Sequence, residues 1–270
     1  MPKRVPSVSD LGVTLSDGLP AAAPGRRAPF QTVTYGDRIV VSYTPELDGG
    51  GNRYGQDYAR VVRKLFGRVD SLMEWCAGPG FIGFSLMASD LCEELTLADV
   101  NPAAVEACRV TVNRNGLESR VRVHLSDNLK TVPRHAPWDL VVGNPPHSGS
   151  SEVVPRLQHR ARFLYMDAGW AIHRRFYQTI RHHLHEGSSV LVQENSTFSS
   201  VDDFRDMVRD GGLEIMGVEE CAAEPKGMYY YIWSRPRFRR AAPRTGPPRA
   251  VSPTQTDQRD GVEPSVGGKP

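Results

Sequence analysis

The sequence predicts a doubly wound α/β fold, with a mostly parallel seven-stranded sheet and an antiparallel last strand. From Ser71 onward, short apolar strands alternate with helical segments, which is typical of a parallel sheet covered by helices on both faces. Two apolar runs near the C-terminus flank a Pro-Lys-Gly turn, which indicates a hairpin and therefore one reversed strand. The strands are expected at Ser71–Trp75, Leu95–Ala98, Val121–Leu125, Leu140–Gly143, Val190–Gln193, Leu213–Cys221 and Met228–Trp233.

A hairpin and a helix are expected before the sheet. Gln31–Val41 alternates polar and apolar residues around Gly36-Asp37, which is a hairpin signal. Tyr58–Phe66 has apolar residues at helical spacing. The helices between the strands are expected near Gly83–Asp90, Pro102–Asn115, Ala161–Leu184 and Val201–Asp210.

These elements suggest one catalytic domain with extensions. We expect residues 31–69 to form an N-terminal hairpin and helix cap and residues 70–236 to form the catalytic domain. Residues 1–30 are rich in Pro, Ala, Ser and Arg without periodicity, and residues 237–270 are rich in Pro and Arg. Both terminal segments are therefore expected to be disordered.

Charge is distributed unevenly along the chain. The formal net charge is +2, yet residues 1–30 carry four basic and two acidic side chains and residues 237–270 carry seven and three, which leaves residues 31–236 at −4. Because phosphate contacts supply most nucleic-acid affinity, this mildly acidic stretch suits a small-molecule or peptide partner better than a polyanion.

The four cysteines show no C-x-x-C spacing, and no clustered histidines complete a zinc site, so no metal is expected. The N-terminal residues lack the apolar core of a signal peptide, and no stretch approaches the roughly 20 apolar residues of a membrane span. We therefore expect a cytoplasmic protein with reduced thiols and no membrane partner.

A glycine-rich turn, Cys76-Ala77-Gly78-Pro79-Gly80, follows the first strand of the sheet and leads into an apolar helix. Glycines allow tight turning and close approach to a ligand, and a helix N-terminus presents free N–H groups to a carboxylate or phosphate. Asp99 ends the next strand about 20 residues later, where a carboxylate can bind ribose hydroxyls. This spacing fits both nicotinamide dinucleotides and S-adenosylmethionine, and an ordinary tight turn stays an alternative.

Two further strand ends carry polar residues. Ser126-Asp127-Asn128 places an acid where it can accept a hydrogen bond from an adenine amino group, although a capping role is the alternative. Asn144-Pro145-Pro146-His147 follows a buried strand. Its prolines stiffen the loop and remove donors, so that the Asn144 side-chain oxygen and the Pro145 carbonyl can hold a planar nitrogen in line with a methyl carbon. His147 would lie against the flat acceptor group.

Residues 70 to 235 resemble the class I S-adenosylmethionine-dependent methyltransferases. The Asn-Pro-Pro segment resembles the branch that contains release-factor glutamine methyltransferases and amino-group DNA and RNA methyltransferases. The resemblance implies that Asn144, Pro145, Pro146 and His147 are catalytic. It implies a cofactor site, which we extend to neighbouring polar positions, at Glu74, Cys76, Gly78, Gly80, Asp99, Asn101, Asp127, Asn128 and Asn144. Cys76 stands where the family usually has glycine, and His147 where it has Tyr, Phe or Trp, which leaves the acceptor open.

Three residues outside these motifs are candidates for substrate binding. Asp167 and Trp170 lie after the Asn-Pro-Pro loop, where helix packing is the alternative role for the tryptophan. Glu194 follows the fifth strand, on the carboxyl edge where open α/β sheets bind ligands. If the acceptor is a guanidinium, His147 or Glu194 are the candidates to take its proton.

The sequence thus predicts an S-adenosylmethionine-dependent N-methyltransferase acting on an amide, guanidine or amine nitrogen of a small molecule or peptide. The alternative is a methyltransferase for an exocyclic base amine in RNA or DNA, with the arginine-rich stretch Arg235 to Arg249 as an electrostatic arm. A nicotinamide-dependent oxidoreductase and an inactive binding module are two further alternatives.

Overall fold

The computed structural model describes residues 29–48, 51–134, 137–149, 165–223 and 225–237, with the backbone alone for residues 51–56. The two terminal segments expected to be disordered lie outside the described residues, apart from residues 29–30 and 237. No helix in the described ranges is long and apolar enough to cross a membrane.

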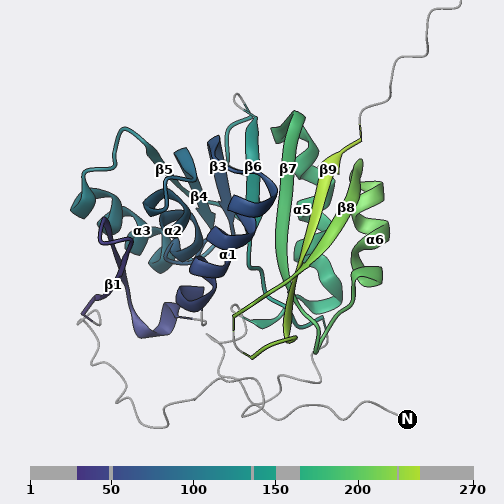
Figure 1. The fold of residues 1–270 in the computed structure, drawn as a ribbon, viewed down its shortest axis with the longest axis horizontal. Coiled ribbons are helices and arrows are strands. Elements are labelled where there is room, and N and C mark those ends of the chain that lie inside the picture. The colour runs from purple at the N-terminus through teal and green to yellow at the C-terminus, as the bar shows by residue number, and fades with distance from the viewer. Residues whose placement is uncertain (1–28, 49–50, 135–136, 150–164, 224, 238–270) are drawn as a thin grey trace, which may run out of the picture. The chain divides into compact units, whose positions relative to one another are not determined.

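A seven-stranded sheet runs through the molecule in the order β5-β4-β3-β6-β7-β9-β8 (Figure 1). Strands β3 to β7 pair in parallel, whereas β9 is antiparallel to both β7 and β8. The reversed last strand therefore lies between two others, and the predicted fold class is confirmed. The strands are β3 (Val69–Trp75), β4 (Cys92–Asp99), β5 (Val121–Leu125), β6 (Trp138–Gly143), β7 (Leu184–Asn195), β8 (Leu213–Glu220) and β9 (Tyr229–Pro236).

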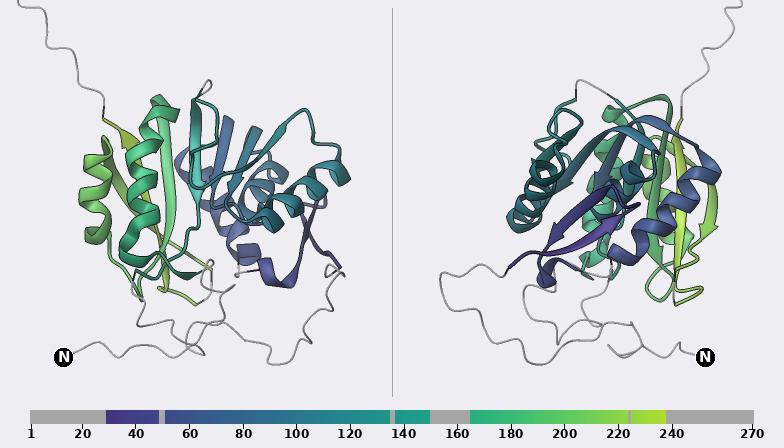
Figure 2. Two further views of the ribbon diagram at one scale, coloured as in Figure 1. Left: turned by 180° about the vertical axis from the view of Figure 1, so that it is seen from behind. Right: turned by 60° about the vertical axis from the view of Figure 1, so that its left-hand side comes forward.

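Helices cover both faces of this sheet (Figure 2). Alternate residues of a strand point to opposite faces, so Leu72 joins the hydrophobic cluster with α1, α2 and α3, while Met73 joins the cluster with α5 and α6. Burial on both faces explains why β6 is a nearly continuous apolar run rather than an alternating one. The helices are α1 (Gly51–Leu65), α2 (Phe81–Ala88), α3 (Pro102–Asn115), α5 (Ala171–Ile180) and α6 (Val201–Asp210).

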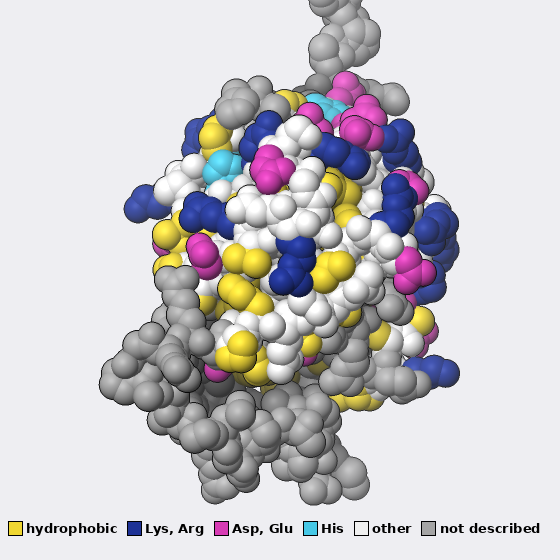
Figure 3. Space-filling model, turned by 90° about the vertical axis from the view of Figure 1, so that its left-hand side faces the viewer, with side chains coloured by type: hydrophobic (Ala, Val, Ile, Leu, Met, Phe, Trp, Pro, Cys, Tyr) yellow, Lys and Arg dark blue, Asp and Glu magenta, His cyan; other side chains and the backbone are white. Residues whose placement is uncertain are grey.

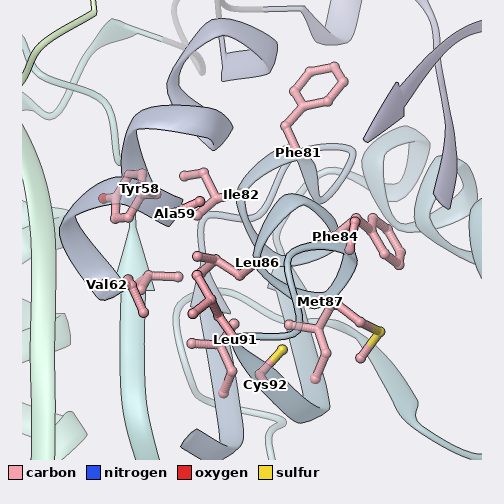
Figure 4. Close-up of a cluster of buried hydrophobic side chains, with 14 of the residues drawn as sticks. Tyr58, Ala59, Val62, Phe81, Ile82, Phe84, Leu86, Met87, Leu91 and Cys92 are labelled. Carbon is pink, nitrogen blue, oxygen red and sulfur yellow. The ribbon is translucent and has the colours of Figure 1, made fainter. Parts of the chain in front are cut away.

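The N-terminal hairpin of β1 (Gln31–Tyr35) and β2 (Ile39–Tyr43) packs against the main domain. The Ser42 N–H donates to the Thr111 hydroxyl on α3 at 2.9 Å. Figure 4 shows Tyr58 and Val62 of α1 beside side chains of α2 in the same buried cluster. Hairpin and helix therefore share one hydrophobic cluster with the seven-stranded sheet.

Two predicted helix boundaries are wrong. Helix α1 begins at Gly51, seven residues before the predicted start at Tyr58. The prediction missed the first turns of the helix because their sequence lacks apolar periodicity. In place of the helix predicted over Ala161–Leu184, of which residues 161–164 lie outside the described ranges, α5 covers ten residues and β7 begins at Leu184. The break before α5 falls at Gly169 and Trp170, both with positive φ, a conformation that right-handed helices exclude.

Candidate active site

A cavity of about 380 Å³ opens at the carboxyl ends of four neighbouring parallel strands. Open α/β sheets bind ligands at this edge. The wall includes many of the residues that the sequence singles out, and they lie in pairs at the ends of four different strands. They are Cys76 and Gly78 after β3, Asp99 and Asn101 at the end of β4, Asp127 and Asn128 after β5, and Asn144 and Pro146 after β6.

The glycine-rich turn after β3 needs left-handed backbone. Gly78 and Gly80 have φ of 52° and 82°, and Cys76, which is not a glycine, has φ of 53°. A Cβ atom at Gly80 would lie 2.7 Å from the Phe84 ring. Glycine at position 80 is therefore required both for backbone conformation and for space.

Glu74 lies beneath this turn rather than on the cavity wall. Its carboxylate accepts from the backbone N–H groups of Ile82 at 3.4 Å and Gly83 at 2.7 Å, in the first turn of α2. Burial raises the pKa of Glu74 to about 8. The N–H groups at the helix N-terminus that the sequence suggests as a ligand's anion site are thus bound by the chain's own carboxyl group, and Glu74 supports the turn.

Asp99 links the glycine turn to α3. Its two carboxylate oxygens accept from Gly78 N at 2.7 Å and Asn101 N at 2.8 Å. Burial raises the pKa of Asp99. Asn101 caps α3 by accepting from Ala103 N at 3.0 Å. Each Asp99 oxygen keeps a second lone pair for a ligand.

The loop after β5 reaches the start of α5. Asp127 forms an ion pair with Arg175 at 3.1 Å, with both side chains half exposed. Asn128 donates to the Ile172 carbonyl at 3.0 Å, and its own side-chain oxygen is buried without a hydrogen-bond partner in the described part of the chain. Such an atom is costly unless a ligand or water satisfies it.

The loop after β6 presents a second such oxygen. Asn144 Oδ1 is buried and has no hydrogen-bond partner among the described residues. The carbonyl just before it, that of Gly143, accepts from the Tyr58 hydroxyl at 2.5 Å. At the other end of the loop, Ser148 N donates to the Tyr165 carbonyl at 2.8 Å. Both ends of the loop are therefore fixed, and Asn144 and Pro146 reach the cavity.

Behind this loop, four titratable side chains form a row, and three of them are buried. His147 Nδ1 lies 3.6 Å from Glu194 Oε2, and Glu194 Oε1 lies 2.8 Å from His173 Nε2. His173 Nδ1 in turn lies 2.6 Å from Asp167 Oδ2. We call Asp167, His173, Glu194 and His147 the buried relay.

The charges of the buried relay follow from these contacts. Burial alone would lower the pKa of His173, but the two carboxylates raise it to about 9. Burial opposes ionisation of Asp167 and Glu194, yet their pKa values are lowered, chiefly by hydrogen bonding and charge from His173. His173 is thus an imidazolium between two carboxylates. Its nitrogens are both engaged, and within the described ranges no group of three or more His, Cys, Asp or Glu side chains is placed to hold a metal ion.

Several predicted site residues do not line the cavity itself: Glu74, Gly80, Pro145, His147, Asp167, Trp170 and Glu194. Trp170 packs edge-on against His173 and Phe204, with ring centroids 5.4 and 4.9 Å apart. Sequence reasoning missed Trp75 on the cavity wall and His173 in the buried relay. No motif marks His173; only its spacing of six residues from Asp167, across a helix start, could have suggested it.

Comparison of the sequence with known protein families gives a match over about half of the chain. Residues 59–196 match the profile of the methyltransferase small domain family. The chain belongs to the methyltransferase small domain family. Among solved structures, this member is similar to the T. thermophilus 16S rRNA N2 G1207 methyltransferase in complex with AdoMet and guanosine, with a TM-score of 0.58, 14% identity, and coverage of 80% of this chain and 53% of that one.

Curated relatives of this methyltransferase small domain protein cover part of its length. It is 32% identical over 83 residues to the release factor glutamine methyltransferase of Clostridium acetobutylicum, which is 30% of this chain and 29% of the relative. It is 32% identical over 124 residues to the ribosomal RNA small subunit methyltransferase C of Proteus mirabilis, which is 44% and 34%. The chain therefore spans less than half the length of these relatives.

Proposed function

We propose that this protein is an S-adenosylmethionine-dependent N-methyltransferase that acts on a planar nitrogen, in an amide, guanidine or amine, of a small molecule or peptide. One observation carries the proposal. A single cavity is lined both by the glycine turn with Asp99 and Asp127 and by Asn144 and Pro146. A methyl donor and its acceptor nitrogen need such a shared space, because they react only when held in line.

The residues of the cavity fit the cofactor. Asp99 and Asn101 would hold the ribose, Asp127 and Asn128 the adenine, and the turn at Gly78 the amino-acid end. The cavity volume lies in the range of small-molecule sites, and the unpartnered Asn128 oxygen suits an amino group. When bound, the cofactor would supply an electrophilic methyl group.

Glu74 argues against a nicotinamide dinucleotide in the same cavity. Dinucleotide-binding folds place the pyrophosphate at the helix N-terminus after the first strand. Here the carboxylate of Glu74 accepts from Ile82 N and Gly83 N at this position. A pyrophosphate would have to displace a buried carboxyl group that already satisfies these donors.

The acceptor nitrogen would donate to Asn144 Oδ1 and to the Pro145 carbonyl. An amide, guanidine or aromatic amine has a delocalised lone pair, and hydrogen bonds to its N–H groups favour the pyramidal form that attacks a methyl carbon. The unpartnered state of Asn144 Oδ1 supports this role. So do the names of two kinds of relative, the release factor and uL3 glutamine methyltransferases.

Titration calorimetry with S-adenosylhomocysteine, the product of methyl transfer, tests the cofactor assignment. Val100 lines the cavity and is 53% exposed, so Val100→Trp should fold normally yet block binding. Val218→Trp is the matched control, since Val218 is 49% exposed on β8 and does not line the cavity. Failure of the wild-type protein to bind S-adenosylhomocysteine, together with binding of NADH, would contradict the proposal. Radiolabelled cofactor with fractionated small molecules, peptides and RNA would then identify the acceptor class.

A base amine in RNA or DNA is the second candidate, because ribosomal RNA small subunit methyltransferase C is among the relatives. On the face shown in Figure 3, basic and acidic side chains are interspersed among the coloured residues, so basic side chains do not dominate that face. Salt-sensitive binding to RNA that is lost on deleting residues 237–270 would favour this candidate.

We also propose a cytosolic location, which the four unpaired cysteines support.

A further inference from the structure

The buried relay extends from the start of α5 to the end of the Asn-Pro-Pro loop. Asp167 is fixed by the backbone, because its carboxylate accepts from Ile172 N at 2.7 Å and His173 N at 3.0 Å. His173 is completely buried, with the rings of Trp75, Trp170 and Phe204 around it. The side chains of Asp167, His173 and Glu194 are thus held in one arrangement by their contacts.

Proton positions in the relay follow from this arrangement. Carboxylates accept hydrogen bonds, so His173 must donate from both ring nitrogens, to Asp167 and to Glu194. Glu194 thereby uses Oε1 and retains Oε2. Oε2 and His147 Nδ1 are both buried, both without a hydrogen-bond partner in the described residues, and 3.6 Å apart. Glu194 Oε2 and His147 Nδ1 therefore face each other. Shortening the distance between them by about half an ångström would complete a hydrogen bond.

The opposite nitrogen of His147, Nε2, then has no hydrogen-bond partner among the residues that the structure describes. If Nδ1–H points to Glu194, the neutral imidazole carries its lone pair on Nε2. The His147 side chain is 13% exposed, and because Nδ1 itself is buried, that exposure belongs to the rest of the side chain, which includes Nε2. His147 follows Pro146, which lines the cavity.

We propose, on the basis of the methyltransferase function above, that Asp167, His173 and Glu194 are positioning residues that hold His147 with Nδ1–H toward Glu194, so that His147 Nε2 takes the proton that the acceptor nitrogen loses. In the transfer, the acceptor N–H bond breaks and the nitrogen forms a bond to the methyl carbon. The proton goes to Nε2, and the electron pair of the broken sulfur–carbon bond stays on sulfur. The relay carries two carboxylates against one imidazolium, so a second imidazolium at His147 brings it to neutrality.

Nitrogen-15 NMR of the histidine rings tests this arrangement without any acceptor. We would record the full-length protein saturated with S-adenosylhomocysteine at neutral pH and assign the signals with a His147→Gln variant. The relay predicts two protonated nitrogens in His173, and in His147 a protonated Nδ1 and a bare Nε2. A bare Nδ1 in His147, or a bare nitrogen in His173, would overturn the proposal.

A Glu194→Gln variant adds a test that a purely structural role would not affect. The side-chain amide of this variant offers one acceptor oxygen where the carboxylate of Glu194 has two, so it cannot accept from both His173 Nε2–H and His147 Nδ1–H. Either His173 loses a proton or the His147 proton moves to Nε2, and one of the two spectra must change. Unchanged spectra for both rings would count against the relay.

Glu219→Gln is the matched control, because Glu219 pairs with Lys64 at the protein surface and lies outside the relay. It should leave both histidine spectra as they are. Failure of S-adenosylhomocysteine to bind would contradict the methyltransferase proposal instead, and the spectra of the ligand-free protein would still report on the relay.

Discussion

The Tyr58 hydroxyl donates to the Gly143 carbonyl at 2.5 Å, one residue before Asn144. The same hydroxyl accepts from Gln193 N at 3.1 Å, one residue before Glu194. A single side chain of α1 thus joins the ends of β6 and β7, next to Asn144 and Glu194. Since Tyr58 is fully buried, these bonds have no solvent to replace them.

We expect Tyr58→Phe to leave both backbone groups unpaired and to lower the free energy of unfolding by about 1–3 kcal/mol. The acceptor loop should lose its fixed position, so methyl transfer should fall more than S-adenosylhomocysteine affinity does. Urea denaturation measures the stability, calorimetry the S-adenosylhomocysteine affinity, and transfer of label from radiolabelled cofactor the activity. Tyr43→Phe is the control, because the Tyr43 ring packs edge-on against Phe81 and bonds neither Gly143 nor Gln193; an equal loss there would disprove the joining role.

The side chain of Asn144 should matter for transfer more than for cofactor binding. Removing one oriented hydrogen-bonding group from a reacting centre costs about 10²-fold or more in turnover. We therefore expect Asn144→Ala to bind S-adenosylhomocysteine nearly as well as wild type while transfer of label to the accepting fraction collapses. Asn113→Ala, on the exposed side of α3, is the control. Parallel loss of binding and turnover in Asn144→Ala would count against its assignment to the acceptor.

The sequence predicts the sheet well because its strands are buried on both faces and read as apolar runs, as β6 does. The position of the strand-end residues is equally predictable from the sequence, since parallel strands must bring Gly78, Asp99 and Asn144 to one edge of the sheet. Roles that depend on side-chain contacts cannot be predicted in this way. Nothing in the sequence shows that Glu74 bonds the first turn of α2, or that His173 faces both Asp167 and Glu194.

Stability should decrease as pH rises above neutrality. The folded-state pKa of His173 is raised to about 9 from 6.5, so the stability gained from its protonated form is complete below pH 6.5 and lost as pH rises through about 9. Each proton linked in this way changes the free energy of unfolding by about 1.4 kcal/mol per pH unit. Urea denaturation across this range measures the slope.

Glu74 contributes with the same sign over a lower range, because its pKa is raised to about 8 from 4.5. Burial favours its protonated form, so stability is lost as pH rises from 4.5 through about 8. Glu74→Gln should therefore flatten the curve between pH 4.5 and 6.5, reduce its slope between 6.5 and 8, and leave the His173 part up to about pH 9. A wild-type stability that stays level from pH 6.5 to 9 would show that neither group is shifted as described.

Cys76 carries left-handed backbone strain at the head of the glycine turn, with φ of 53°. A side chain in this conformation costs about 1–2 kcal/mol, whereas glycine costs about 0.5–1 kcal/mol in chain entropy. Cys76→Gly should therefore be equal in stability to wild type or up to about 1.5 kcal/mol more stable. Cys76→Val should be less stable than either, since a β-branched residue fits this region worst. Thermal denaturation of the three proteins gives the order, and a valine variant as stable as the glycine variant would refute the strain.

Gly80 combines two requirements that a matched pair of variants can separate. Gly80 and Gly212 have similar positive φ, 82° and 77°. A Cβ at Gly80 would lie 2.7 Å from the Phe84 ring and 3.1 Å from Leu97, whereas at Gly212 the nearest atoms belong to the Arg181 side chain at 3.7 Å. Both Gly→Ala variants carry the φ penalty of about 1–2 kcal/mol, and Gly80→Ala should lose about 1–3 kcal/mol more in the free energy of unfolding from overpacking.

Denaturation of both variants measures the difference, and calorimetry should show weakened S-adenosylhomocysteine binding for Gly80→Ala alone. Equal destabilisation of the two would mean that the turn after β3 has room for a side chain and owes its glycine to backbone conformation only.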